Sequence, residues 1–141
     1  MSFDKDCFYC VKDNRLTDIM IEICKLEVST LYLFKEQTYR GRCLVAYNDH
    51  KSEIFNLNEE QRSRYMEDVS RVAAALNKAF SPHKINYGAY ADKMTHLHFH
   101  IVPKYEDGPS FGGTFEMMPK DKVLLKDEEY TQLINKIKES L

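Results

Sequence analysis

Three histidines alternate with apolar residues over positions 96–102, in the order His-Leu-His-Phe-His-Ile-Val. In a β-strand, successive side chains point to opposite faces, so this spacing places His96, His98 and His100 together on one face. Neighbouring rings on that face stand roughly 6.6–6.8 Å apart, close enough to converge on one small ligand. Three of the chain's five histidines lie in this segment, which argues against an ordinary solvated strand face.

Such a face fits two kinds of chemistry. Three imidazoles can bind zinc or a related metal, which then activates water for hydrolysis. Alternatively, one neutral imidazole attacks a phosphate and forms a phosphoramidate that water hydrolyses, while the flanking histidines neutralise the developing charge. Metal ligands usually come from several elements of a fold, whereas three ligands on one strand splay apart. The pattern therefore favours covalent catalysis and leaves a metal-dependent hydrolase as the alternative.

The segment 96–102 resembles the signature of the histidine triad (HIT) family at every position, and the glycine turn at 37–45 is similar to that of one bacterial branch. The resemblance implies an α+β fold, an antiparallel sheet of about five strands with one long helix and a C-terminal helix. It implies a homodimeric hydrolase or transferase that cuts nucleotides at the α-phosphate. His98 corresponds to the family's nucleophile and His100 to the residue that contacts the transferred phosphate. His96 either contacts substrate or binds a metal.

Cys7 and Cys10 have the spacing of half a zinc site, which by itself is weak evidence, since a surface thiol pair or a redox motif has the same spacing. The arrangement resembles zinc-bearing HIT proteins, which combine two N-terminal cysteines with a histidine after the third strand and the first triad histidine. His50 and His96 occupy the matching positions. The resemblance therefore implies a structural zinc on these two cysteines and two histidines.

Two predicted substrate-binding positions depart from the family pattern. Asp92 stands where relatives usually carry Asn or Gln, and a carboxylate there repels phosphate unless it is protonated or paired, for which Lys93 is the obvious local partner. It serves either as an acid for the leaving group or as an ordinary turn residue. Thr95 replaces a common proline, and its hydroxyl could bind substrate. A catalytically weakened nucleotide-binding protein therefore remains a second alternative.

The elements that must position these residues are read from periodicity and capping. Short segments rich in branched and aromatic residues predict five strands, at 19–23, 30–34, 43–47, 84–90 and 96–102. A capping box at Asn58 and Gln61 begins an amphipathic helix that ends before Ser81-Pro82, and a second helix begins near Asp127. The N-terminal cysteines are expected in a loop, and a second loop is expected at 106–119. Its part 108–115 is expected to be an ordinary surface connection, with a flexible flap over the base or a dimer contact as alternatives. The helices are expected to cover one face of the sheet.

Length and composition set the outer limits. A chain of 141 residues predicts one domain spanning 1–141, and 43% hydrophobic with 30% charged residues excludes disorder and coiled coil. No apolar run is long enough to cross a membrane and no signal-peptide core is present, so a cytoplasmic protein is expected. Twenty basic against 22 acidic residues argue against bulk nucleic acid as a partner and leave a small anionic nucleotide.

Overall fold

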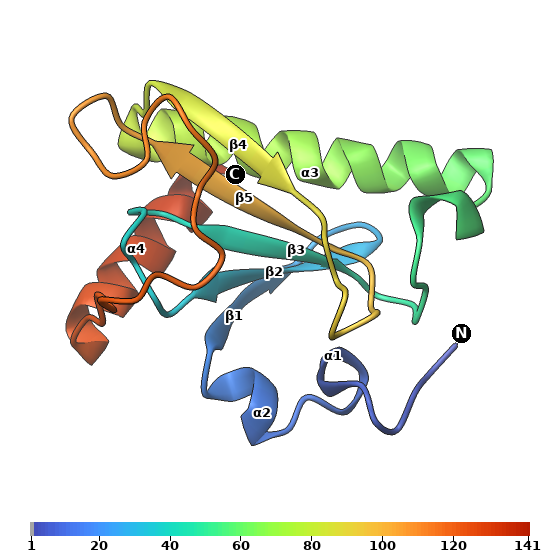
Figure 1. Ribbon diagram of the computed structural model, residues 1–141. Coiled ribbons are helices and arrows are strands. Elements are labelled where there is room, and N and C mark those ends of the chain that lie inside the picture. The colour runs from blue at the N-terminus through green and yellow to red at the C-terminus, as the bar shows by residue number, and fades with distance from the viewer. Residues whose placement is uncertain (1) are drawn as a thin grey trace.

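One antiparallel sheet organises residues 2–141, the part of the chain that this computed structural model describes (Figure 1). Its strand order is β1-β2-β3-β5-β4. The strands are β1 (Met20–Lys25), β2 (Ser29–Phe34), β3 (Cys43–Tyr47), β4 (Lys84–Gly88) and β5 (His98–Lys104). The helices are α1 (Phe8–Val11), α2 (Asn14–Thr17), the 3-10 turn η1 (Ile54–Asn56), α3 (Glu59–Phe80) and α4 (Asp127–Ser140). The predicted α+β class, with five strands, one long helix and a C-terminal helix, is confirmed.

The long helix α3 begins at the predicted capping box. The Asn58 side chain accepts a hydrogen bond from the Gln61 backbone, and the Gln61 side chain accepts one from the Asn58 backbone. The helix ends at Ser81, whose left-handed φ of 49° reverses the chain. Its apolar side packs with α4 on one face of the sheet, where Leu33 and Ile101 are fully buried. No helix within residues 2–141 is long and apolar enough to cross a membrane.

The opposite face of the sheet is covered at one end by the N-terminal segment, which Figure 1 shows in blue. Tyr9 and Leu16, from the short helices α1 and α2, pack against the alternate side chains of β2 and β3. As a result every residue of these two strands is buried, and the expectation of a single covered face is wrong. The sheet is a middle layer between the helices α3 and α4 and the N-terminal helices.

Several predicted boundaries need correction. Cys7 directly precedes the helix α1 and Cys10 lies within it, where a loop was expected. The first strand is shifted to Met20–Lys25. The histidine strand begins at His98, because the backbone N–H of Leu97 donates to the carbonyl of Lys51, beyond the end of β3, at 2.7 Å. His96 therefore precedes the strand. These differences arise from long-range contacts, which periodicity does not report.

Gly41 makes the turn between β2 and β3 possible. Its φ is +90°, a region that side chains disfavour, and a Cβ built there would lie 2.7 Å from the Phe80 ring at the end of α3. Pro103, on β5, would lie 3.3 Å away. Because the neighbours are ring atoms held in the core, this position requires glycine for two independent reasons.

We expect Gly41→Ala to lower the free energy of unfolding by about 2–4 kcal/mol, the sum of backbone strain and overpacking. Gly112→Ala is the matched control, since Gly112 has a φ of +92° but nothing within 4 Å of its Cβ position. It should cost only the backbone contribution, about 1 kcal/mol. Urea denaturation of the three proteins measures both effects, and equal losses would show that the contact with Phe80 is unimportant.

Candidate functional site

A cavity of about 570 Å³ opens over the histidine face of β5. Two of the three histidines, His98 and His100, line it directly. The other lining residues come from the loop after β4 and from the segment after β5: Tyr90, Ala91, Asp92, Lys93, Thr114, Phe115, Met117 and Met118. The cavity thus combines two imidazoles with an aromatic and thioether wall, a setting that suits a small ligand with a flat apolar part and a polar group.

His98 is fixed by the backbone of the same segment. Its Nδ1 lies 2.7 Å from the carbonyl oxygen of His96, and because a carbonyl only accepts, the N–H of the bond is on Nδ1. The remaining nitrogen, Nε2, then carries a free lone pair. Burial lowers the pKa of His98, which keeps the ring neutral, and the Tyr9 ring packs 5.1 Å away. A neutral imidazole with one committed nitrogen is the form that nucleophilic attack requires.

His100 has a different partner. Its Nδ1 lies 3.1 Å from a guanidinium nitrogen of Arg42, a residue that directly precedes β3 and is fully buried. Burial and the neighbouring cation lower the pKa of His100 to about 2, so its ring is neutral at any physiological pH. Burial also lowers the pKa of Arg42 to about 10, which still leaves the guanidinium charged at neutral pH.

His96 turns away from the cavity. Its Nε2 lies 2.6 Å from the carbonyl oxygen of Tyr47, to which it donates, and its Nδ1 faces the two N-terminal cysteines and His50. The four ligand atoms of Cys7, Cys10, His50 and His96 lie within 4.8 Å of one another. These are the four residues that the sequence indicated, and together they could hold a metal ion.

The spacing of these atoms can be tested against the metal that the residues suggest. A tetrahedral zinc with bonds of about 2.0–2.1 Å to nitrogen and 2.3 Å to sulfur sets N–N contacts near 3.4 Å and S–N contacts near 3.5 Å. His50 and His96 have their Nδ1 atoms 3.2 Å apart, and the S–N distances are 3.4 Å for Cys7 to His96 and 3.4 Å for Cys10 to His50. The hydrogen bond that His96 Nε2 donates to the Tyr47 carbonyl also holds this ring in the orientation that metal binding needs. The residues fit zinc.

The two remaining candidates, Asp92 and Thr95, are both exposed. Asp92 lines the cavity but is exposed, as is Lys93, and within residues 2–141 they form no ion pair with each other. Thr95 is exposed and does not line the cavity. The structure thus brings Asp92 near the two histidines and leaves Thr95 outside.

Sequence reasoning missed part of the cavity wall. For the segment 108–115 an ordinary surface connection was favoured over a flap above the base, but Phe115 of this segment lines the site, as do Met117 and Met118 after it. Arg42 was also missed, although the strand register offers a signal: Leu44 pairs with His100, and a residue two positions earlier falls on the same face.

A glycine is needed at position 88, opposite His100, because a Cβ there would lie 2.8 Å from the ring of Phe115.

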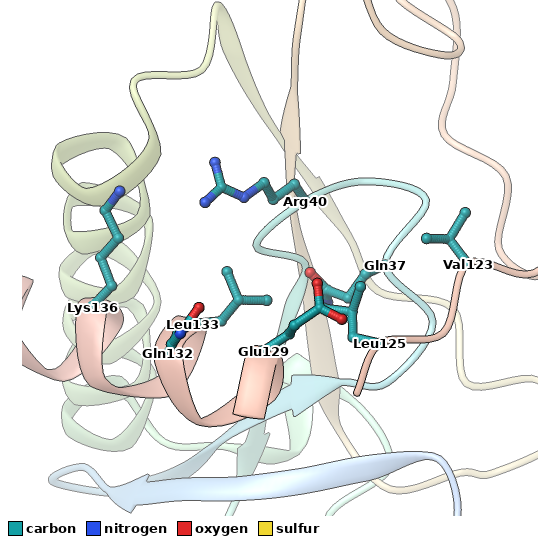
Figure 2. A pocket seen from close by; sticks show the side chains of 8 residues that line it. All are labelled: Gln37, Arg40, Val123, Leu125, Glu129, Gln132, Leu133 and Lys136. Atoms are coloured by element: carbon teal, nitrogen blue, oxygen red, sulfur yellow. The ribbon is translucent and has the colours of Figure 1, made fainter. Parts of the chain in front are cut away.

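A second cavity of about 500 Å³ lies between α4 and the turn that precedes β3. Figure 2 shows the side chains that line it, from Gln37 and Arg40 in the turn, from Val123 and Leu125, and from the α4 residues Glu129, Gln132, Leu133 and Lys136. Among the residues that the structure describes, neither a histidine nor a cysteine lines it. Its importance for the site is indirect, since Gln37 also donates hydrogen bonds to the carbonyls of Phe34 and Arg42.

The sequence model of a protein family, the HIT domain, matches residues 21–107 of the chain. A protein named hit from Bacillus subtilis is 27% identical over 95 residues, which make up 64% of this chain and 66% of that protein. An uncharacterized HIT-like protein of Mycoplasma genitalium is 30% identical over 103 residues, 70% of each chain.

Solved structures agree over a larger part of the chain. A histidine triad protein from Sinorhizobium meliloti has a TM-score of 0.83 and 25% identity, covering 92% of this chain and 95% of its own. A zinc-bound histidine triad family protein from Mycobacterium smegmatis has a TM-score of 0.67 and 16% identity, covering 95% of this chain and 94% of its own. At that level of identity the second likeness shows the shared fold alone.

The low pKa of His100 predicts acid sensitivity. An unfolded histidine has a pKa of about 6.5, so below that pH the unfolded chain binds a proton that the folded chain does not. The free energy of unfolding should therefore decrease as the pH is lowered below about 6.5, by up to about 1.4 kcal/mol per pH unit for this residue. His100→Asn retains an oxygen that accepts from Arg42 but cannot titrate. In denaturation curves between pH 6 and pH 4, its free energy of unfolding should fall less steeply than that of the wild type. Equal pH dependence of the free energy of unfolding in the two proteins would contradict the lowered pKa of His100.

Proposed function

The chain belongs to the HIT family, and from that premise we propose that it cleaves nucleotides at the α-phosphate through a covalent nucleotidyl intermediate on His98. The observation that carries this proposal is the bond between His98 Nδ1 and the His96 carbonyl, which leaves Nε2 unprotonated beside the cavity. The substrates in view are dinucleoside polyphosphates and nucleoside phosphoramidates, whose flat base suits the wall formed by Phe115 and the two methionines.

The proposed reaction has two steps. In the first, the Nε2 lone pair of His98 forms a bond to the α-phosphorus, and the bond from phosphorus to the leaving group breaks. The leaving group keeps that electron pair and takes a proton from solvent. In the second step, water adds to phosphorus, the P–N electron pair returns to Nε2, and the proton of the water passes to solvent. One difficult displacement is thereby divided into two easier ones.

The neighbouring groups assist without bonding to phosphorus. Throughout both steps the Nδ1–H of His98 stays on the His96 carbonyl, which stabilises the ring when it bears the nucleotidyl group. In this proposal His100 donates a hydrogen bond to a phosphoryl oxygen as negative charge builds up there. Asp92 at the rim repels additional negative charge, which favours an amine over a polyphosphate as the leaving group.

The arrangement of possible ligands supports covalent catalysis over metal-activated water. Within the described chain, the one group that could hold a metal contains His96 but neither His98 nor His100. The Nδ1 atoms of those two rings are committed to a carbonyl and to a guanidinium. A hydrolytic metal on all three histidines would require the His96 ring to turn away from Cys7, Cys10 and His50.

We expect His98→Asn to lower turnover by about 10³-fold or more, because the nucleophilic nitrogen is absent. Asparagine keeps an amide donor for the His96 carbonyl, so the fold should be retained. The assay follows diadenosine polyphosphates and an adenosine phosphoramidate, each with and without chelator, and His83→Asn is the matched control because His83 is exposed outside the cavity.

An acid-labile nucleotidyl adduct on the wild type, absent from His98→Asn, would support the covalent step. Near-normal rates in His98→Asn would show that the mechanism is wrong. Nucleotide binding with no turnover of any substrate would instead indicate a binding protein.

We also propose that the ion held by Cys7, Cys10, His50 and His96 is zinc with a structural role. Four protein ligands close a tetrahedral site, which leaves no position for a reacting water. Bound there, the metal supplies a crosslink between the helix α1 and the start of the catalytic strand. The thiolates require a reducing environment, consistent with the cytoplasmic location expected from the sequence.

A homodimer remains the family expectation, and the outer edge of β4, with Tyr87 exposed, is a sheet edge that could form it.

The purified protein should contain about one zinc per chain, measured by elemental analysis after gel filtration. Cys10→Ser should lose most of this zinc and melt at a lower temperature. Cys24→Ser is the matched control, since Cys24 is another half-buried cysteine but lies on β1, outside the ligand group. Unchanged zinc in Cys10→Ser would contradict the proposal.

A further inference from the structure

Arg42 is an unusual residue to bury beside a catalytic strand. It is fully buried, and its guanidinium lies over the Phe34 ring at 4.3 Å and the Phe115 ring at 5.1 Å. No carboxylate within residues 2–141 lies at ion-pair distance from it. A buried cation is costly unless its donors are satisfied, so the groups that do satisfy them indicate what it is for.

Those groups belong to His100 and to the segment that forms the cavity wall. One Nη atom donates to the carbonyl of Met117 at 2.9 Å and lies 3.1 Å from Nδ1 of His100, and the other donates to the carbonyl of Glu116 at 3.2 Å. Nε has no partner. Arg42 does not line the cavity itself, so it contacts the ligand space only through His100 and the wall segment.

The chemistry of the guanidinium determines the state of His100. A guanidinium has only donors, so Nδ1 of His100 must present a lone pair, and the proton of the neutral ring is then on Nε2. In His98 the bond to the His96 carbonyl requires the reverse, with the proton on Nδ1. The two rings have centroids 5.2 Å apart and therefore present a lone pair and an N–H side by side.

We infer that Arg42 is a positioning residue that locks His100 as a neutral Nε2–H donor, the opposite tautomer to His98, so that His100 can stabilise a phosphoryl oxygen but cannot act as a proton shuttle. The catalytic part of this inference rests on the proposed function. A second proton on Nδ1 would face the guanidinium directly, so the lock excludes the imidazolium as well as the other tautomer. The proton for the leaving group then comes from solvent or the rim, and not from His100.

The test combines a spectroscopic signature with kinetics. In ¹⁵N-labelled protein at pH 7, two-bond ¹H–¹⁵N spectra distinguish a protonated from an unprotonated ring nitrogen. We expect wild-type His100 to show an unprotonated Nδ1 and a protonated Nε2, assigned by the loss of its signals in His100→Asn. In Arg42→Met, which removes the donor, His100 should show a mixture of tautomers. With the best substrate of the panel, kcat should fall by about 10–100-fold with little change in KM.

Two further variants keep the test decisive. Arg42→Gln keeps an N–H donor without the charge and should show the wild-type tautomer. If Arg42→Met does not fold, the unprotonated Nδ1 of His100 in the wild type is the deciding observation. Arg40→Met is the matched control, because Arg40 lies in the same turn and is exposed, with its guanidinium 5.2 Å from the centroid of the Phe80 ring. It should keep both the tautomer and the rate.

A protonated Nδ1 in the wild type, or an unchanged tautomer in Arg42→Met, would overturn the inference, as would an unchanged kcat in an active enzyme. These results differ from a failure of the proposed function. If His98→Asn were fully active, or if no substrate were turned over, the spectra would still report whether Arg42 fixes His100. A change in KM alone, with the tautomer retained, would mean that Arg42 only supports the wall at Met117.

Discussion

The backbone carbonyl of His96 is the constraint on which the site depends. It accepts from His98, and so fixes which nitrogen of that ring is free. Its position is fixed in turn by the His96 ring, which donates to Tyr47 on one side and faces the cysteines on the other. A residue outside the cavity therefore determines which nitrogen of His98 is free inside it.

Two adjacent histidines on one strand face are chemically equivalent by type, yet the structure makes them different. Burial keeps both neutral, since burial disfavours the charged form of an imidazole. What distinguishes them is the partner of Nδ1, a carbonyl for His98 and a guanidinium for His100. The division of roles thus comes from hydrogen-bond donors and acceptors on neighbouring segments, and the triad pattern alone does not contain it.

The sequence was informative wherever the signal is local. The capping box at Asn58 predicted the start of α3. The alternation at 96–102 predicted one face for His96, His98 and His100, of which His98 and His100 lie on the strand and line the cavity while His96 precedes it. Local patterns could not show that residues 7–10 include a helix or that Phe115 returns to the cavity, because packing against distant strands decides both. Arg42 was missed for the same reason, since an arginine before a strand usually faces solvent and only the register with β5 reveals its burial.

The ligand group of Cys7, Cys10, His50 and His96 also has a consequence for biosynthesis. Cys7 leaves the ribosome 89 residues before His96, so the contact between these two residues cannot form until the histidine strand has emerged. Contacts of such high sequence separation close large loops and form late. The thiols of Cys7 and Cys10 are thus synthesised well before His96, and until translation has passed position 96 they lack one of the groups that surround them in the folded protein.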